Sequence, residues 1–267
     1  MSNPIASANA EISEFRAALY DCDAAKLRRQ LQAFCSPECD IVLAHPLGPI
    51  SGPDALFESA YAPLLNAIPD LERRDYIVIG AVDQGEHWIA CGGYYTGVFE
   101  KPWLRIPPTQ HLVTMRYIEF FRIEGDRIVE MRLLWDIPQL MMQADAWPMA
   151  PSLGVEIHVP GPATQDGIVT TPNDEAQSAA SLQLVKDMVE GLSKYASGGH
   201  KAMQLERFWH PKMNWYGPAG IGSSRRISGF RNWHQVPFLN ALPDRRSDTK
   251  EGGYDCFFAD GNYVAFC

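Results

Sequence analysis

Two eight-residue segments of the chain have closely similar sequences. Residues 63–70 have the sequence Pro-Leu-Leu-Asn-Ala-Ile-Pro-Asp, and residues 237–244 have the sequence Pro-Phe-Leu-Asn-Ala-Leu-Pro-Asp. The offset of 174 also aligns a Phe-x-x-Pro pattern at residues 34–37 with the same pattern at residues 208–211. Amphipathic stretches with helical spacing precede both occurrences. A match at one fixed offset indicates an internal duplication, so we expect two copies of one fold.

The duplication predicts the domain organisation. We expect a first domain over residues 1–147, a linker over 148–174 that is rich in Pro, Gly and Thr, and a second domain over 175–267. Residues 88–91 align with residues 263–267 if a short insertion is placed near residues 217–228. The first copy continues through two further patterned strands, whereas the second stops there. We therefore expect an incomplete second domain, and favour a fragment of a longer protein over a naturally truncated one.

The pattern of the first copy indicates an α+β fold. Helices are expected first, with Asp23 as the N-cap of a helix over residues 24–34, and long antiparallel strands follow. A curved antiparallel sheet wrapped on helices makes a cone-shaped α+β barrel with an open mouth, here as a tandem repeat. Gly92, Gly93 and Gly97 are expected at bends or bulges, and Pro63 at a helix kink. The expected strands are 39–44, 75–82, 86–99, 111–123 and 127–135; further helices begin at residue 52 and span 139–144.

Composition excludes several classes of protein. The chain has 267 residues and a net charge of −9 without a Lys/Arg block, so nucleic acid is not an expected partner. No apolar run approaches the ~20 residues of a membrane span, and the start of the chain shows no secretion signal. Six scattered cysteines are expected to be reduced thiols in a cytoplasmic protein. No metal-ligand spacing or phosphate-binding loop is present, so neither a metal nor a cofactor is expected.

Several segments of the first copy carry distinctive motifs: Gly52-Pro-Asp-Ala-Leu, the run over residues 63–75, Gly93-Tyr-Tyr-Thr-Gly97, Pro102-Trp103-Leu, Ile106-Pro-Pro-Thr109 and Gly125-Asp-Arg-Ile-Val-Glu130. These motifs resemble SnoaL-like polyketide cyclases of the nuclear transport factor 2-like superfamily. In the second copy, Trp215-Tyr-Gly-Pro218 and Gly229-Phe resemble the same group. The resemblance implies a cone-shaped cavity and cofactor-free ring closure, in which a carboxylate removes a proton from a carbon next to carbonyls. It also implies a homodimer or an intramolecular pseudo-dimer packed sheet to sheet.

The family's usual base does not occur in this sequence. The resemblance implies a His and an Asp shortly after Ile-Val-Glu, but these positions hold Met131 and Leu133. The next carboxylate is Asp136, which is either a catalytic residue or the cap of the short helix that follows.

Glu119 is the second candidate for a catalytic carboxylate. At strand spacing it shares one face with Val113, Met115, Tyr117 and Phe121, and burial there would raise the pKa of a carboxyl group. The alternative is an outward face, or pairing with an Arg such as Arg132. His45 is a third candidate, as a base or donor at the cavity rim; the alternative is an ordinary loop histidine.

The expected ligand is a small hydrophobic carbonyl compound. The favoured function is cyclase-type acid–base chemistry; the alternatives are a hydratase or hydrolase on the same scaffold, or a non-catalytic binding module. Aromatic residues could donate hydrogen bonds to a substrate carbonyl, although such residues often only fill the core. The candidate substrate-binding residues are Tyr117, Trp88, Tyr94, Met131, Trp215 and His234.

Overall fold

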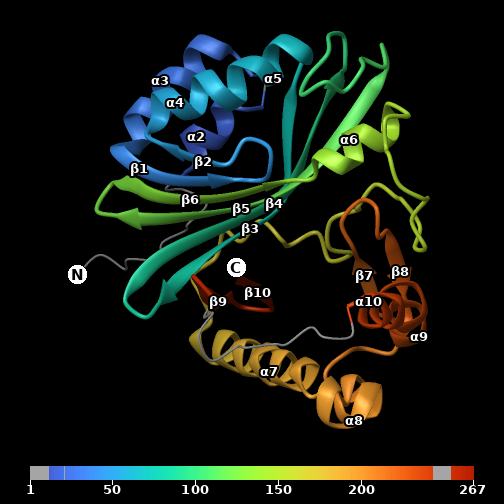
Figure 1. The fold of residues 1–267 in the computed structure, drawn as a ribbon. Coiled ribbons are helices and arrows are strands. Elements are labelled where there is room, and N and C mark those ends of the chain that lie inside the picture. The colour runs from blue at the N-terminus through green and yellow to red at the C-terminus, as the bar shows by residue number, and fades with distance from the viewer. Residues whose placement is uncertain (1–11, 21, 243–253) are drawn as a thin grey trace.

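A curved six-stranded sheet forms the centre of the protein. The computed structural model describes residues 12–20, 22–242 and 254–267. Helices of the N-terminal half cover the inner face of this sheet, and the C-terminal part of the chain (residues 175–267) lies against the outer face (Figure 1). The elements before residue 148 are α2 (Ser13–Ala18), α3 (Ala24–Phe34), β1 (Cys35–Leu43), β2 (Pro49–Ser51), α4 (Pro53–Leu56), the π-helix η1 (Phe57–Tyr61), α5 (Ala62–Ala67), β3 (Glu72–Asp83), β4 (Glu86–Val98), β5 (Leu112–Glu124), β6 (Arg127–Trp135) and α6 (Ile137–Gln143).

The strand order is β2-β1-β6-β5-β4-β3. Neighbouring strands are antiparallel, except that β1 and β6 run parallel. The sheet is curved (Figure 1). It is not closed into a barrel, because β2 and β3 are its two end strands. The expected α+β class with a curved sheet around helices is therefore confirmed.

Local sequence signals explain where the elements begin. The carboxylate of Asp23 accepts a hydrogen bond of 2.7 Å from the backbone N–H of Lys26, so the expected N-cap of α3 is present. Pro53 occupies the first turn of α4, where its missing N–H costs nothing. The π-helix η1 stands directly before Pro63, where the sequence predicts a kink. Strand β1 begins four residues earlier than expected.

The bulge between β3 and β4 lies on β3 rather than on β4. The register between β3 and β4 shifts between Asp75 and Ile77, opposite Gly92 and Gly93. A Cβ atom at Gly93 would stand 2.2 Å from the Tyr117 hydroxyl and 2.3 Å from the Arg74 carbonyl oxygen. Gly93 is therefore required for close approach of these groups, and the expected bulge is formed by the partner strand.

Apart from the 19-residue helix α7, the elements of the C-terminal part are short. They are α7 (Glu175–Ser193), α8 (Tyr195–Ala202), the 3₁₀ helix η2 (Leu205–Arg207), β7 (Asn214–Tyr216), β8 (Ser223–Arg225), α9 (Arg226–Phe230), the π-helix η3 (Arg231–Gln235), α10 (Val236–Ala241), β9 (Phe257–Asp260) and β10 (Tyr263–Phe266).

Part of this region repeats the first half element by element. The pairing of β7 with β8, in which Asn214 faces Arg225, has the register of β1 with β2, in which Asp40 faces Ser51, at an offset of 174. The bounds of η3 and α10 equal those of η1 and α5 at the same offset. No residue is therefore inserted near residues 217–228, and that alignment was wrong. Residues 243 and 244 of the repeated segment, like residues 1–11, lie outside the described residues.

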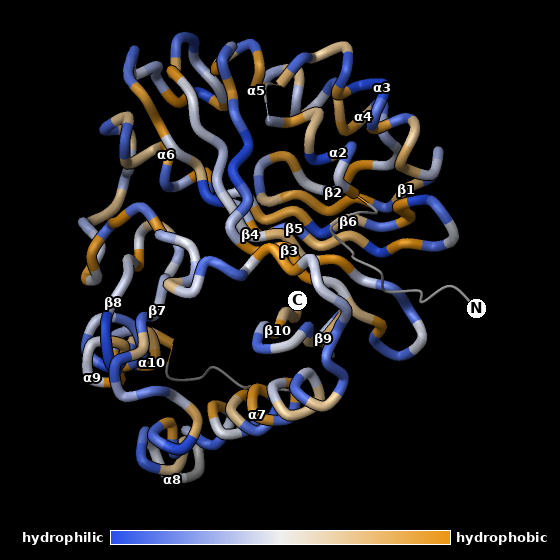
Figure 2. The backbone as a smooth tube through the Cα atoms, turned by 180° about the vertical axis from the view of Figure 1, so that it is seen from behind, coloured by the Kyte–Doolittle hydropathy of each residue, from blue (hydrophilic) through white to orange (hydrophobic). Residues whose placement is uncertain are grey.

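The C-terminal part contacts the outer face of the sheet through the β9–β10 hairpin. Phe258 and Cys256 pack with Trp88 and Phe120 in a second apolar cluster. Residues 148–174 contain no helix and run past the free edge of β3, where Val78 exchanges backbone hydrogen bonds with Gly167 and Val169. Hydrophobic residues are frequent along parts of the strands of the large sheet (Figure 2), and Ile118 and Leu134 remain exposed.

Candidate active site

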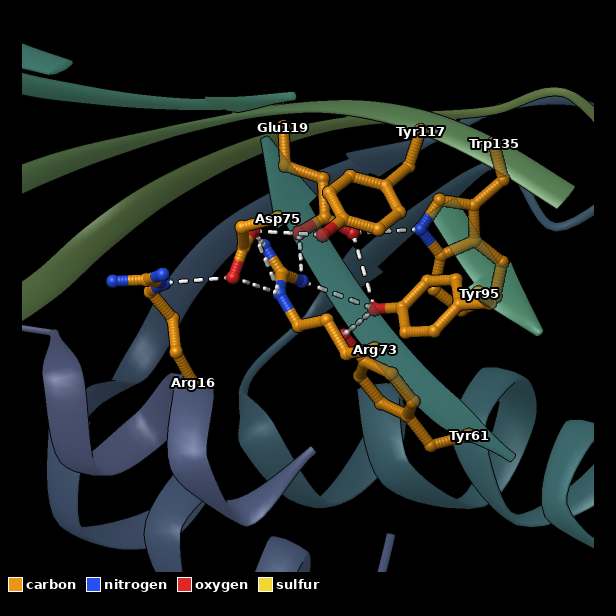
Figure 3. A network of polar contacts seen from close by, with 8 residues as sticks. All are labelled: Arg16, Tyr61, Arg73, Asp75, Tyr95, Tyr117, Glu119 and Trp135. Carbon is orange, nitrogen blue, oxygen red and sulfur yellow. Dashed lines mark hydrogen bonds and ion pairs between the residues drawn. The ribbon is translucent and has the colours of Figure 1, made fainter. Parts of the chain in front are cut away.

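A buried network of charged and aromatic side chains lies between the inner face of the sheet and the helices. Arg73 on β3 is at its centre: one guanidinium nitrogen, Nη1, lies 2.6 Å from Oε2 of Glu119, and Nη2 lies 2.9 Å from Oδ1 of Asp75. Arg16 of α2 contacts the other oxygen of Asp75 at 2.8 Å. We call this set the Arg73 network (Figure 3); it consists of Arg16, Tyr61, Arg73, Asp75, Tyr95, Tyr117, Glu119 and Trp135.

The strand period explains why these side chains meet. Arg73 and Asp75 are two residues apart on β3 and therefore point to the same face. Glu119 and Tyr117 share the inner face of β5 in the same way. The absence of a side chain at Gly93 leaves room for the Tyr117 hydroxyl, which donates a 2.7 Å hydrogen bond to Asp75.

Three donors converge on the carboxylate of Glu119. Besides the guanidinium of Arg73, the indole Nε1–H of Trp135 donates at 2.9 Å and the Tyr95 hydroxyl at 3.3 Å, both to Oε1. Tyr61 extends the network, with its hydroxyl 3.4 Å from that of Tyr95. Each oxygen of Glu119 thus has a partner, as a buried carboxylate requires.

The opposite charges of the Arg73 network keep Asp75 and Arg73 ionised, although burial disfavours their charged forms. Burial by itself raises the pKa of Asp75, but Arg73 and Arg16 outweigh it and hold the pKa of this carboxyl below its usual value. The pKa of Arg73 is raised well above its usual value: burial opposes the charged form, while Asp75 and Glu119 favour it more strongly. Burial raises the pKa of Tyr95 and of Tyr117 well above the usual value. Both tyrosines are therefore protonated hydrogen-bond donors at neutral pH.

The interior around this network is closed. The side chains of Arg73 and Glu119 are fully buried, and that of Asp75 is almost so. A pocket of about 380 Å³ between α8, η2 and η3 and one of about 370 Å³ beside α4 have no lining residue from the Arg73 network. A ligand of Glu119 must therefore enter by separating elements that are in contact here.

The family model of SnoaL-like polyketide cyclases matches residues 13–144. Residues 13–144 belong to the SnoaL-like polyketide cyclase family. The matched range contains every residue of the Arg73 network, so the network lies inside the SnoaL-like domain. Among curated proteins, no sequence matches the chain.

Several solved structures are similar to about half of the chain. TsrD from Streptomyces laurentii is 20% identical, with a TM-score of 0.44 over 54% of this chain and 99% of its own. IdmH from Streptomyces antibioticus is 17% identical, with a TM-score of 0.43 over 51% and 97%. A protein of ketosteroid isomerase-like fold from Catenulispora acidiphila is 13% identical, with a TM-score of 0.41 over 54% and 100%.

Three of the residues predicted from the sequence lie on the inner face of the SnoaL-like domain. Glu119 and Tyr117 belong to the Arg73 network, and Met131 is fully buried in the adjoining core. The partner considered for Glu119 was Arg132, but the structure pairs it with Arg73. Arg132 instead contacts Asp40, Glu130 and Asp255.

Two predicted binding residues lie on the opposite face of the sheet. Trp88 is buried under the β9–β10 hairpin, and Tyr94 packs its ring edge against His158, with centroids 4.0 Å apart. Strand alternation separates Tyr94 from Tyr95, which does reach Glu119. Trp88 and Tyr94 are thus not brought together with the predicted base.

Asp136 binds the C-terminal part of the chain. It stands at the N-cap position of α6, but its side chain makes no capping hydrogen bond. Its Oδ2 instead accepts from Arg116 Nη2 at 2.7 Å and from the backbone N–H of Ala219 at 3.0 Å. Arg116 also donates to the carbonyl oxygen of Gly217 at 2.7 Å. We call these contacts the Asp136 latch.

The remaining predicted residues are elsewhere. His45 is exposed in the turn between β1 and β2, because β1 ends at Leu43. Trp215 and His234 stack on each other in the C-terminal part, with ring centroids 4.3 Å apart and nearly parallel planes. They form an aromatic cluster with Phe230 that is separate from the Arg73 network.

Sequence reasoning missed most partners of Glu119. Arg73, Asp75 and Arg16 were not singled out, although Arg73 and Asp75 fall within the motif run over residues 63–75. The available signal was a pair of opposite charges two residues apart at the start of a strand. Trp135 was also overlooked because it ends its strand next to the more conspicuous Asp136. Within the described ranges, no group of three or more His, Cys, Asp or Glu side chains could hold a metal ion, and no helix is long and apolar enough to span a membrane.

Proposed function

We propose that the SnoaL-like domain performs cofactor-free acid–base chemistry on a small hydrophobic carbonyl compound, with Glu119 as the base. The observation that supports this most is the surroundings of Glu119, a buried carboxylate that is held by Arg73, Tyr95 and Trp135. A base fixed in this way is positioned for proton abstraction without reorganisation.

The hydroxyls of the network supply the second requirement of this chemistry. Removal of a proton next to a carbonyl places negative charge on the carbonyl oxygen, and a protonated donor must stabilise it. Tyr95 and Tyr117 are protonated donors, and Arg73 lies between the two carboxylates with its charge retained. We assign Tyr95 to the substrate oxygen and Met131 to the apolar wall. The reaction requires that α2 or η1 moves to admit the substrate.

A binding module without catalysis is the second candidate. Met131 and Leu133, at the positions where the family resemblance implies a His and an Asp, are both buried apolar residues of the core. Every carboxylate of the Arg73 network is also already paired with an arginine. These observations favour ligand retention over turnover, and the experiment below separates the two.

We propose further that residues 175–267 are a second copy of the same fold, joined by the linker 148–174 to a first domain over 1–147. The equal registers of β1–β2 and β7–β8 support this. The contact of the β9–β10 hairpin with the outer sheet face fits an intramolecular pseudo-dimer. Two further parts of the proposal rest on the sequence. One is a ligand-binding role for Trp215, His234, His45, Trp88 or Tyr94. The other is a cytoplasmic location.

Deuterium exchange tests the proposed chemistry. The probe is 2-tetralone in heavy water, and the rate of exchange beside its carbonyl is followed by NMR with and without protein. Wild-type protein is expected to accelerate exchange, and Glu119→Gln to lower that acceleration by at least about 100-fold. Glu124→Gln, on the exposed end of the same strand, is the matched control and keeps the wild-type rate.

Each outcome selects one reading. If Glu119→Gln exchanges as fast as wild type, Glu119 is not the base. If 2-tetralone quenches tryptophan fluorescence saturably but never exchanges faster than in buffer, the binding module is the better description. Incorporation of ¹⁸O from labelled water into recovered ketone beyond the uncatalysed level would indicate a hydratase or hydrolase.

A further inference from the structure

Two cysteine sulfur atoms lie side by side at the open end of the C-terminal hairpin. Cys256 directly precedes β9 and Cys267 directly follows β10, and their Sγ atoms are 3.5 Å apart. The backbone N–H of Cys267 donates to the carbonyl oxygen of Cys256 at 3.2 Å, so hairpin pairing holds the two residues opposite each other. A disulfide bond is about 2.05 Å long, so side-chain rotation has to bring the sulfurs about 1.5 Å closer.

The two thiols differ in exposure and acidity. Cys256 is fully buried, whereas Cys267 is partly exposed. The hydrogen bond from the Cys256 thiol lowers the pKa of Cys267, and burial and Asp255 oppose this while Arg132 assists it. The same hydrogen bond and burial raise the pKa of Cys256. A partly exposed thiol of lowered pKa beside a buried second thiol is the usual arrangement of an oxidisable cysteine pair.

We propose that Cys256 and Cys267 form a reversible intramolecular disulfide that closes the β9–β10 hairpin against the outer face of the sheet. The oxidant is a low-molecular-weight disulfide. The Cys267 thiolate attacks one of its sulfurs and expels one thiolate, which leaves a mixed disulfide on Cys267. Cys256 then loses its proton, attacks Sγ of Cys267 and expels the second thiolate. The two cysteines lose two electrons, and the small disulfide is reduced to two thiols.

The hairpin is fastened to the first domain at several points. Asp255, next to Cys256, contacts Nε of Arg132 on β6 at 3.1 Å, and the backbone N–H of Phe257 donates to Asp83 at 2.9 Å. A covalent link between the two hairpin ends therefore also restrains these contacts. Closing this short loop is expected to raise the unfolding temperature by about 5 °C.

The other cysteines provide an internal comparison. Cys22, Cys35, Cys39 and Cys91 are buried in the core below the inner sheet face. Burial raises the pKa of Cys91, and a hydrogen bond from Cys39 together with burial raises that of Cys35. These four thiols are expected to react far more slowly than Cys267.

Glutathione equilibration tests the proposal. The full chain is reduced, incubated in mixtures of reduced and oxidised glutathione, quenched with acid and alkylated, and its peptides are analysed by mass spectrometry. Wild type is expected to give a peptide pair linked through Cys256 and Cys267, with the other cysteines alkylated. Cys256→Ser is expected to stop at the glutathione adduct of Cys267, and Cys267→Ser to form neither product. Cys91→Ser is the control and behaves as wild type.

Two results would overturn the proposal. The first is that Cys256 and Cys267 remain alkylated in oxidised glutathione while the folded protein is intact. The second is that all six cysteines react at similar rates, because the pair would then have no special reactivity. Melting curves of oxidised and reduced protein provide a second measurement: the expected rise must be present in wild type and absent in Cys256→Ser.

Discussion

Trp135 and Asp136 are neighbours in the chain but serve opposite sides of the sheet. Trp135 donates to Glu119 inside the SnoaL-like domain, whereas Asp136 accepts from Ala219 in the C-terminal part. The facing strand repeats this arrangement: Tyr117, directly opposite Trp135, binds Asp75, and Arg116 beside it binds Gly217. The Asp136 latch thus lies immediately behind two members of the Arg73 network.

Loss of the Asp136 latch is expected to lower the free energy of unfolding and to change the surroundings of Trp135. Asp136→Ala leaves Arg116 without its carboxylate and the Ala219 N–H without an acceptor, which should cost about 1–3 kcal/mol. Urea unfolding measures this free energy, and tryptophan emission shows whether the surroundings of Trp135 change. Asp126→Ala, at an exposed turn, is the control and should change stability by less than about 0.5 kcal/mol. Equal free energies of unfolding for the two variants would mean that the Asp136 latch does not stabilise the protein.

Removal of Arg73 is expected to be far more damaging than removal of its neighbour. Arg73→Met leaves the carboxylates of Glu119 and Asp75 buried beside an apolar side chain, at a cost of about 3–5 kcal/mol. Arg74→Met removes the same charge from an exposed position and should cost less than about 1 kcal/mol. The free energy of unfolding in urea gives both values, and similar losses would contradict the central place of Arg73.

A double variant separates charge from packing at the same site. Because Arg73→Met leaves Glu119 uncompensated, Glu119→Gln should restore part of the lost stability in that background, although it destabilises the wild type. The interaction free energy from the four proteins should be at least about 1.5 kcal/mol. Additive losses would show that the pair does not interact. If Arg73→Met does not fold, Arg73→Lys replaces it in this comparison of four proteins.

The lowered pKa of Asp75 predicts how acid acts on the protein. A carboxyl group whose pKa falls on folding stabilises the native state above its unfolded pKa of about 3.9, and this contribution is lost as the pH falls through the folded value. The stability difference between wild type and Asp75→Asn should therefore be constant from pH 7 to 5 and shrink below about pH 4. Urea unfolding at each pH measures it, with Asp126→Asn as the variant expected to show no such change. If the stability difference between wild type and Asp75→Asn grows on acidification, the pKa of Asp75 is raised rather than lowered on folding.

The hairpin on the outer face should contribute strongly to stability. Phe258→Ala removes a fully buried ring from the cluster with Trp88 and should cost about 3–5 kcal/mol. Phe266→Ala, on the partner strand but exposed, should cost under about 1 kcal/mol. Thermal and urea unfolding compare the two variants. If Phe258→Ala unfolds in two separate transitions, the hairpin detaches before the SnoaL-like domain unfolds.

The sequence predicted local structure better than contacts. The Asp23 cap and the shared face of Val113, Met115, Tyr117 and Glu119 follow from hydrogen bonding and strand period, which depend on nearby residues only. The repeat was visible because the segments 63–70 and 237–244 are similar in sequence, whereas the two π-helices have different sequences and equal bounds at the offset of 174. The position of the insertion was wrong because the alignment rested on a second short match beyond Ala241.

The partners of the candidate site were not predictable in the same way. Whether Trp88 or Ile89 faces the helices depends on which side of the sheet they cover, and alternation alone fixes only that the two differ. Arg73 and Glu119 are 46 residues apart, and their pairing requires the register of three strands. The role of Asp136 depended on a loop more than 80 residues away, for which its own surroundings give no signal.

The charged side chains of the Arg73 network balance one another. It contains two guanidinium groups, Arg16 and Arg73, and two carboxyl groups, Asp75 and Glu119. A neutral guest leaves this balance unchanged, whereas an acid or an amine would add an uncompensated charge in a region without solvent, at a cost of several kcal/mol. Under the proposed function, the domain would therefore favour an uncharged ligand over an ion before any difference in shape is considered.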